Sequence, residues 1–229
     1  AKESHSARAL SEIDFLLREA GVKVSEINLF ASSTGPGSFT GLRIGLAMIK
    51  SFAATLERPC YGVSTLAALA RGAGPREGGV VAILPAGRGE LFAQTFRVGF
   101  GREVRTLDDP VHLRPEALWE RMLARSEPLF WCGPGVHLYS AQICDYAARK
   151  GVHCTVMDEG LNQVSDGWVI SPARTVIACE VGALAAAAKK DQWLKAEELS
   201  ALYVRRADPE LKAESQKAIQ LEQTITRAG

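Results

Sequence analysis

The sequence predicts an α/β fold in two parts, each with a sheet covered by helices. In the first third of the chain, segments with helical periodicity alternate with short apolar runs, which is typical of a parallel sheet layered with helices. A glycine-rich segment at 72–79 then interrupts the pattern and reads as a linker. Beyond it, three strand-like runs precede a second alternation of helix and strand, so a second layered domain is expected.

The first part is expected to run helix, strand, helix, strand, helix. Gly21 ends the first helix, at 6–20, as a C-cap. The apolar face of that helix is formed by Leu10, Ile13, Leu16, Leu17 and Ala20. The remaining elements are a strand at 27–33, a helix at 40–56, a short strand at 60–63 and a helix at 64–71.

The second part begins with a meander. Strands are expected at 80–84, 90–98 and 103–107, and residues 99–102 form the hairpin connection between the last two. Further elements are helices at 115–124, 136–150 and 173–190 and strands at 129–132 and 154–157. From Pro209 onward a weakly amphipathic helix is expected, with Leu211, Ala218, Leu221 and Ile225 at helical spacing. This tail either docks on a partner or is a linker or a cloning remnant.

A glycine-rich loop between the strand at 27–33 and the helix at 40–56 is the most informative motif. Glycines allow positive φ and a close approach of the backbone, and the first amides of the following helix point outward at the positive end of its dipole. The loop therefore suits an anion or a tightly packed partner. The candidate phosphate-binding residues are Gly35, Gly37, Ser38 and Thr40.

The loop matches neither familiar nucleotide signature. A P-loop has lysine directly after its last glycine, but Gly41 is followed by Leu42 and Arg43. The dinucleotide-binding pattern G-x-G-x-x-G fails as well, because Gly35, Gly37 and Gly41 have the spacing G-x-G-x-x-x-G, with one extra residue before the last glycine. The alternative interpretation is a tight strand-to-helix turn capped by the hydroxyl of Ser38 or Thr40.

The helix at 40–56 is apolar on two sides. One stripe consists of Leu42, Leu46, Ile49, Ala53 and Leu56, and the other of Gly41, Gly45, Met48 and Phe52 with Ile44 beside them. An ordinary surface helix has one apolar face, so the second must be covered by another layer of the domain or by another chain. Phe15 lies on the charged side of the first helix and is interpreted as part of the same docking surface.

Composition is that of an ordinary globular protein. Hydrophobic residues make up 47% of the chain and the net charge is +1. Nucleic-acid binding proteins usually carry a basic stripe with interleaved aromatic residues, and none is seen, so any contact with RNA is expected to be indirect. No apolar run is long enough to span a bilayer and residues 1–5 do not resemble a signal peptide, so a cytoplasmic location without membrane contact is expected.

Cysteine and histidine spacing predicts neither a disulfide framework nor a metal site. The five cysteines are odd in number and contain no C-x-x-C pair, so buried free thiols are expected. The four histidines show neither H-x-x-x-H nor H-E-x-x-H spacing. The cysteines are Cys60, Cys132, Cys144, Cys154 and Cys179.

Several motifs of the chain point to one protein family. They are Gly35-Pro36-Gly37-Ser38-Phe39-Thr40-Gly41-Leu42-Arg43-Ile44-Gly45, His5-Ser6, Gly62-Val63-Ser64-Thr65-Leu66, Arg88-Gly89-Glu90-Leu91-Phe92 and Leu202-Tyr203-Val204-Arg205-Arg206-Ala207-Asp208. Together they resemble the bacterial TsaB (YeaZ) family of the actin-like ATPase (ASKHA, RNase H-like) superfamily. The resemblance implies two actin-like subdomains, at 1–71 and 80–208, and a helical tail at 209–229.

The family resemblance also implies a function. It implies a non-catalytic subunit that pairs with its paralogue TsaD to support threonylcarbamoyl transfer to the adenosine beside the tRNA anticodon. The same surface would allow a homodimer, and a larger complex would include the ATPase TsaE. The partner-binding residues implied are Phe15, Gly41, Arg43, Ile44, Gly45 and Met48. TsaD carries H-x-x-x-H metal ligands where this chain has Thr65 and Leu69, which cannot ligate a metal as imidazole does.

The chain departs from the family at two places. Family members begin with a strand hairpin carrying an Asp-Thr-Ser phosphate loop, and this sequence starts at Ala1 without it. Because a sheet without its central strands would expose unpaired edges, we expect these strands to be missing from the sequence rather than from the protein. The family's Asp-Ala-Arg appears here as Pro85-Ala86-Gly87. Weak binding of ATP or ADP with magnesium at an inter-domain cleft stays open.

Two other functions are weighed against the partner subunit. One is an enzyme in its own right, either an ATP hydrolase or kinase that uses the glycine loop, or a glycoprotease-like peptidase. The missing P-loop lysine, the absent histidines and the lack of a Ser/His/Asp set speak against it. The other is a direct tRNA-binding module, which only Arg205-Arg206 and scattered lysines support.

Overall fold

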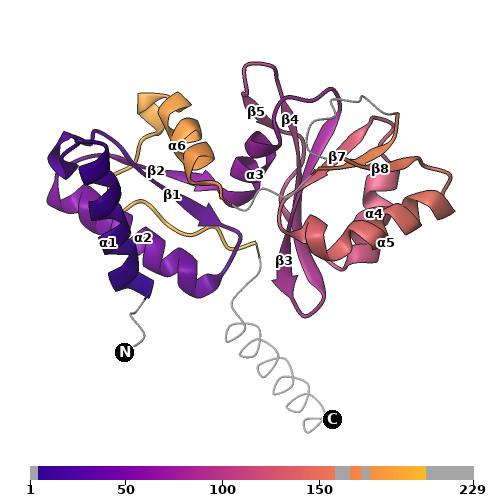
Figure 1. Cartoon of the computed structure of the whole chain (residues 1–229), viewed down its shortest axis with the longest axis horizontal. Coiled ribbons are helices and arrows are strands. Elements are labelled where there is room, and N and C mark those ends of the chain that lie inside the picture. The colour runs from indigo at the N-terminus through magenta and orange to yellow at the C-terminus, as the bar shows by residue number, and fades with distance from the viewer. Residues whose placement is uncertain (1–4, 158–165, 172–175, 205–229) are drawn as a thin grey trace, which may run out of the picture.

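Two lobes, each built on its own sheet, make up the molecule (Figure 1). The computed structural model describes residues 5–157, 166–171 and 176–204. Within those residues the helices are α1 (His5–Glu19), α2 (Phe39–Thr55), α3 (Thr65–Ala73), α4 (Pro115–Leu123), α5 (Gly135–Arg149) and α6 (Ala178–Ala187). The strands are β1 (Phe30–Gly35), β2 (Cys60–Ser64), β3 (Gly79–Gly87), β4 (Glu90–Val98), β5 (Val104–Thr106), β6 (Val111–Leu113), β7 (Leu129–Cys132), β8 (Cys154–Val156) and β9 (Trp168–Ile170).

The first lobe contains a parallel β-α-β unit. β1 and β2 pair in parallel, with Phe30 opposite Cys60, and α2 connects them. Short polar side chains start the helices that follow both strands, since Ser38 accepts a hydrogen bond from the Gly41 amide and Ser64 accepts one from the Ala67 amide. One small core of this lobe consists of Phe30, Leu46, Ala53, Cys60 and Leu199, and a second consists of Val63, Ala68, Val181 and Ala185.

The second lobe has a mixed sheet that is buried on both faces. Its strand order is β5-β4-β3-β7-β9-β8, and β6 pairs with β4. Alternate residues of β3 enter opposite cores: Val81 and Ile83 pack with α4 and α5, whereas Val80 and Ala82 pack with α3. A near-continuous apolar run is what a strand buried on both sides requires. Figure 1 shows α4 and α5 on one side of this sheet and α3 on the side toward the first lobe.

After the second sheet the chain returns to the first. α6 contacts both β1 and β2, and beyond it the Leu194 amide donates to the Cys60 carbonyl at 2.8 Å while the Cys60 amide donates back at 2.9 Å. Leu199 is buried in the core of the first lobe. The expected subdomain at 80–208 is therefore too long, because residues 178–201 pack on the first sheet. Helical periodicity shows that a segment needs an apolar surface but not which sheet supplies it.

Most predicted elements are confirmed to within a few residues, with four differences. The linker is shorter than 72–79, since Gly72 is buried in α3 and Gly79 begins β3. The strand expected at 27–33 begins only at Phe30. Of the helix expected at 173–190, residues 173–175 lie outside the described residues, and the described part forms α6 over Ala178–Ala187. β6 and β9 were not predicted. The tail from Pro209 lies outside the described residues.

The prediction of free buried thiols is correct for two cysteines and wrong for three. Cys60 and Cys132 are buried and free. Cys144 and Cys154 form a disulfide, and Cys179 is exposed. A count of cysteines cannot reveal the bond, because its two members meet only when β8 runs back along the end of α5.

A largely buried ion pair links the two lobes. Glu180 on α6 pairs with Arg71 on α3, and its other carboxylate oxygen lies 3.8 Å from Nη2 of Arg102 in the β4–β5 hairpin. The Glu180 side chain is only 12% exposed. Loss of one member of a buried pair leaves the other charge without a partner in a poorly solvated site.

We therefore expect Glu180→Ala to destabilise the protein by about 3 kcal/mol. The matched control is Glu12→Ala, which removes the exposed pair between Arg8 and Glu12 on α1 and should change stability by less than about 0.5 kcal/mol. Urea unfolding followed by circular dichroism measures both. Equal effects of the two substitutions would contradict the linking role of Glu180.

Candidate partner-binding surface

Large apolar side chains on α1 are open to solvent. Phe15 is 61% exposed and Leu16 is 64% exposed, and Leu10 is exposed as well. Figure 1 places α1 on the side of the first lobe that faces away from the second. Leu10 and Leu16 belong to the apolar face that the sequence predicts for this helix, whereas Phe15 lies on its charged side, so α1 exposes large apolar side chains on two sides. The sequence-based prediction that Phe15 is exposed is confirmed.

Local interactions hold α1 in helical form although so much of it is exposed. Arg8 pairs with Glu12 and Arg18 pairs with Asp14, both at the i,i+4 spacing that stabilises a helix. Gly21 then adopts a φ of 63° and ends the helix, as predicted, and its amide donates to the Arg18 carbonyl. The apolar side chains of α1 are therefore presented on a formed helix.

The second apolar side of α2 divides into two halves. At its C-terminal half, Phe52 stacks on Phe30 with ring centroids 5.7 Å apart and so belongs to the core of its own lobe. At its N-terminal half, Gly41 is exposed, and Ile44 and Met48 are half-buried. The expected docking surface on α2 is thus confined to its first three turns.

Gly45 is half-buried and faces β1. A Cβ atom at Gly45 would lie 3.7 Å from the Ser32 Oγ, which is ordinary contact distance, so alanine would fit there but a longer side chain would meet β1. A side chain larger than alanine at this position would push α2 away from the strand beneath it. Substitutions that probe the surface are therefore better made at neighbouring positions.

The N-terminal end of α2 carries an exposed aromatic pair that the sequence did not single out. The Phe39 and Tyr203 rings lie 5.8 Å apart, and the guanidinium carbon of Arg43 lies 3.8 Å from the centre of the Phe39 ring. All three residues are exposed. Aromatic and arginine side chains of this kind dominate binding energy at protein interfaces. The sequence could have pointed to Phe39 and Tyr203 only through the family motifs that contain them.

The first glycine of the loop, Gly35, is required for packing. Gly35 has a φ of 120°, and a Cβ there would lie 2.7 Å from the Leu202 carbonyl oxygen. The returning chain occupies this space, where the Leu202 amide donates to the Thr34 carbonyl at 2.8 Å. Gly37 and Thr40 are exposed. The predicted capping role of Ser38 is confirmed, which favours the capped-turn interpretation of the loop.

No cluster of metal-ligating side chains occurs among the residues that the structure describes. Thr65 lies in the first turn of α3, and Leu69 is 4% exposed and belongs to the core under that helix. In the same part of the chain, no helix is long and apolar enough to cross a membrane.

Comparison with known proteins identifies the family. The family model described as TsaD, tRNA N6-adenosine threonylcarbamoyltransferase, matches residues 1–119, which is 119 of 229 residues. The chain belongs to the TsaD family. The match includes α1, the glycine loop, α2 and α3.

Members named TsaB resemble this chain over a greater length. The Escherichia coli (strain K12) tRNA threonylcarbamoyladenosine biosynthesis protein TsaB is 33% identical over 57% of this chain and 58% of its own length. Bacillus subtilis (strain 168) TsaB is 27% identical over 66% of this chain and 65% of its own length. The chain thus spans less than two thirds of either relative.

A solved structure shows the same fold. It is a Pseudomonas aeruginosa protein described as having similarity to peptidase YeaZ, with a TM-score of 0.66, 27% identity and coverage of 89% of this chain and 85% of that one. Together these comparisons confirm the resemblance to TsaB/YeaZ and the actin-like α/β fold that it implied.

Proposed function

We propose that this protein acts in the synthesis of threonylcarbamoyladenosine in tRNA, as a non-catalytic subunit that pairs with a TsaD-type transferase. The names of its Escherichia coli and Bacillus subtilis relatives support the pathway. The observation that carries the role as a subunit is the exposure of large apolar side chains on two sides of α1, Phe15 on one side and Leu16 on the other. A cytoplasmic location follows from the pathway.

The docking surface combines α1 with the first turns of α2. Its members in this proposal are Phe15, Gly41, Arg43, Ile44, Gly45 and Met48, with Phe39 and Tyr203 added from the structure. The TsaD-type partner is a paralogue of this chain, so a homodimer can form through the same surface and would compete with the heterodimer. The ATPase TsaE joins the larger complex, and tRNA contacts the assembly through the transferase.

The lack of catalytic activity is supported by two positions in α3. Where the resemblance implies metal-binding histidines in the transferase, this chain has Thr65, which has no imidazole, and Leu69, which is buried in the apolar core. Replacing Leu69 by a metal ligand would require reopening that core. The transferase would therefore supply the reaction chemistry.

A reconstituted reaction tests the proposal. We expect a purified TsaD-type transferase with its activated threonylcarbamoyl donor, TsaE and tRNA to modify tRNA at least about tenfold faster when this protein is added. This protein without the transferase should give no modified nucleoside by mass spectrometry. ATP turnover by the protein alone, or an unchanged rate on its addition, would contradict the role as a non-catalytic subunit and favour the actin-like enzyme.

A further inference from the structure

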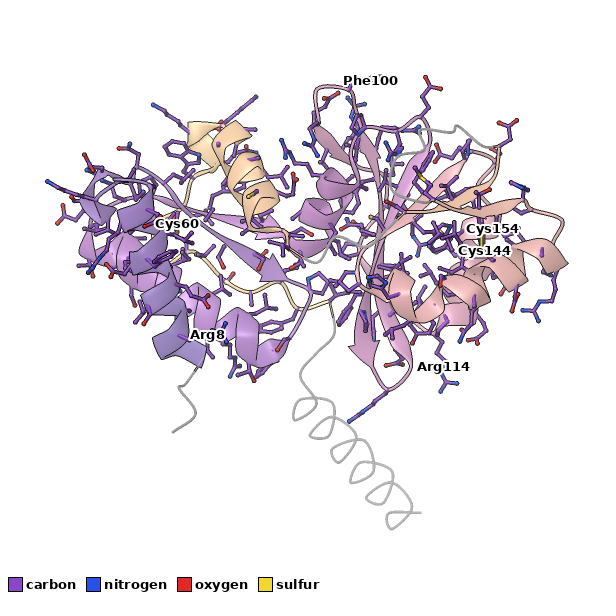
Figure 2. All side chains as sticks on the ribbon, in the orientation of Figure 1. Arg8, Cys60, Phe100, Arg114, Cys144 and Cys154 are labelled. Atoms are coloured by element: carbon purple, nitrogen blue, oxygen red, sulfur yellow. A yellow bond between two sulfur atoms is a disulfide. The ribbon has the colours of Figure 1, made fainter. Side chains whose placement is uncertain are left out.

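A disulfide joins the end of the second sheet to the helix beside it. Cys144 on α5 and Cys154 at the start of β8 are bonded, with their Cα atoms 5.3 Å apart (Figure 2). The chain between them leaves α5, turns at Gly151 with a φ of 73°, and comes back as β8. The bond therefore closes a short loop at the edge of the lobe.

The strand that this bond holds lies at the edge of the described sheet. β8 is a three-residue strand that pairs only with β9, at the end of the described sheet. Val156 within it is 59% exposed. Just beyond β8, the Met157 amide donates to the Ile170 carbonyl at 2.8 Å. Val152 and Cys154 also pack on the core of the lobe, and the Trp168 amide donates to the His153 carbonyl at 2.9 Å. Short, partly exposed edge strands nevertheless open at a low free-energy cost, so the covalent link to α5 adds to these contacts in holding β8.

The two bonded cysteines differ from the other three. Burial raises the pKa of the Cys132 thiol to about 12 and raises the pKa of the Cys60 thiol as well, so neither forms the reactive thiolate readily. Cys179 is exposed but is bonded to no other cysteine. Cys144 and Cys154 are both partly exposed and adjacent. Among the described cysteines, this pair alone combines access with a bonding partner.

We propose that Cys144 and Cys154 form a reversible redox pair that clamps β8 to α5. With glutathione disulfide as oxidant, one thiolate attacks its sulfur to give a mixed disulfide and release one glutathione. The second thiolate then displaces the other glutathione and leaves the protein disulfide, so two protein thiols are oxidised while one glutathione disulfide is reduced to two glutathiones. Reduction reverses both steps and frees β8. This inference does not depend on the proposed function.

The test equilibrates the purified full chain in a series of reduced-to-oxidised glutathione ratios. Alkylation followed by peptide mass spectrometry should show the Cys144–Cys154 pair passing from dithiol to disulfide within that series. The oxidised protein should melt about 5 °C higher than the reduced one, because a closed loop restricts the unfolded chain. On reduction, hydrogen exchange should speed up at the Met157 amide and stay unchanged in the first lobe.

Matched variants separate the pair from the other thiols. Cys144→Ser should abolish the redox dependence of melting and of exchange, whereas Cys179→Ser should leave both unchanged. If Cys144→Ser does not fold, the reduced and alkylated wild-type protein replaces it. A pair that stays oxidised in excess reduced glutathione, stays reduced in excess glutathione disulfide, or accumulates mixed disulfides would overturn the proposal, as would unchanged exchange at β8.

Discussion

Replacing Phe15 by glutamate should abolish co-elution of this protein with a TsaD-type transferase. Phe15 is 61% exposed, so the substitution disturbs no core in the protein by itself. In the complex, an aromatic side chain at the centre of the contact would be replaced by a charge that no partner group neutralises. Such changes at the centre of an interface raise the dissociation constant by about a hundredfold or more. Size-exclusion chromatography and isothermal titration calorimetry measure the loss.

A second substitution on α2 extends the test. Ile44 is half-buried at the open half of α2, and Ile44→Glu should weaken binding to a similar degree if both helices contact the partner. Circular dichroism of the isolated variant checks that its fold persists. Loss of binding by Phe15→Glu with full binding by Ile44→Glu would restrict the contact to α1.

Phe100 provides the matched control. It is 82% exposed at the tip of the β4–β5 hairpin of the second lobe, far from α1 in Figure 2. Phe100→Glu makes the same chemical change at another exposed phenylalanine and should leave binding unchanged. If Phe100→Glu abolishes co-elution and Phe15→Glu does not, the docking surface lies on the second lobe and the assignment to α1 is wrong.

The sequence predicts those features that are set by neighbouring residues. The cap made by Ser38 and the helix stop at Gly21 involve contacts within four residues, and both are confirmed. The exposure of Phe15 follows in the same way from its place on the charged side of a helix. Helices and longer strands are therefore found close to where periodicity places them.

Features that depend on distant parts of the chain were not predicted. Gly35 is needed because Leu202 packs against it, and the aromatic pair at the candidate surface joins Phe39 to Tyr203. Neither contact produces a periodic pattern in the sequence, because each forms only when the C-terminal part of the described chain returns to the first lobe. The sequence could therefore identify the loop and the helix of the candidate site but not the residues that complete it.

The largest loss of stability is expected at the centre of the second lobe. Trp131 is fully buried on β7, where its ring lies 5.2 Å from that of Trp119 and 5.0 Å from that of Trp168. Removing such a ring leaves a cavity between α4 and the sheet that the neighbouring rings can fill only in part. Trp131→Ala should therefore cost about 4 kcal/mol and lower the melting temperature by roughly 10 °C.

Two further variants separate the effect of losing an aromatic ring from the effect of losing the indole group, and test an exposed control position. The Trp131 indole nitrogen has no hydrogen-bond partner within the described residues, so Trp131→Phe gives up no hydrogen bond there and should cost less than about 2 kcal/mol. Leu138→Ala, at an exposed position on α5, should cost less than about 0.5 kcal/mol. Thermal unfolding followed by circular dichroism ranks the three variants by their loss of stability. A loss for Trp131→Phe equal to that for Trp131→Ala would show that the edge-to-face packing of these tryptophans depends on the full indole, since a phenyl ring fills most of the same space.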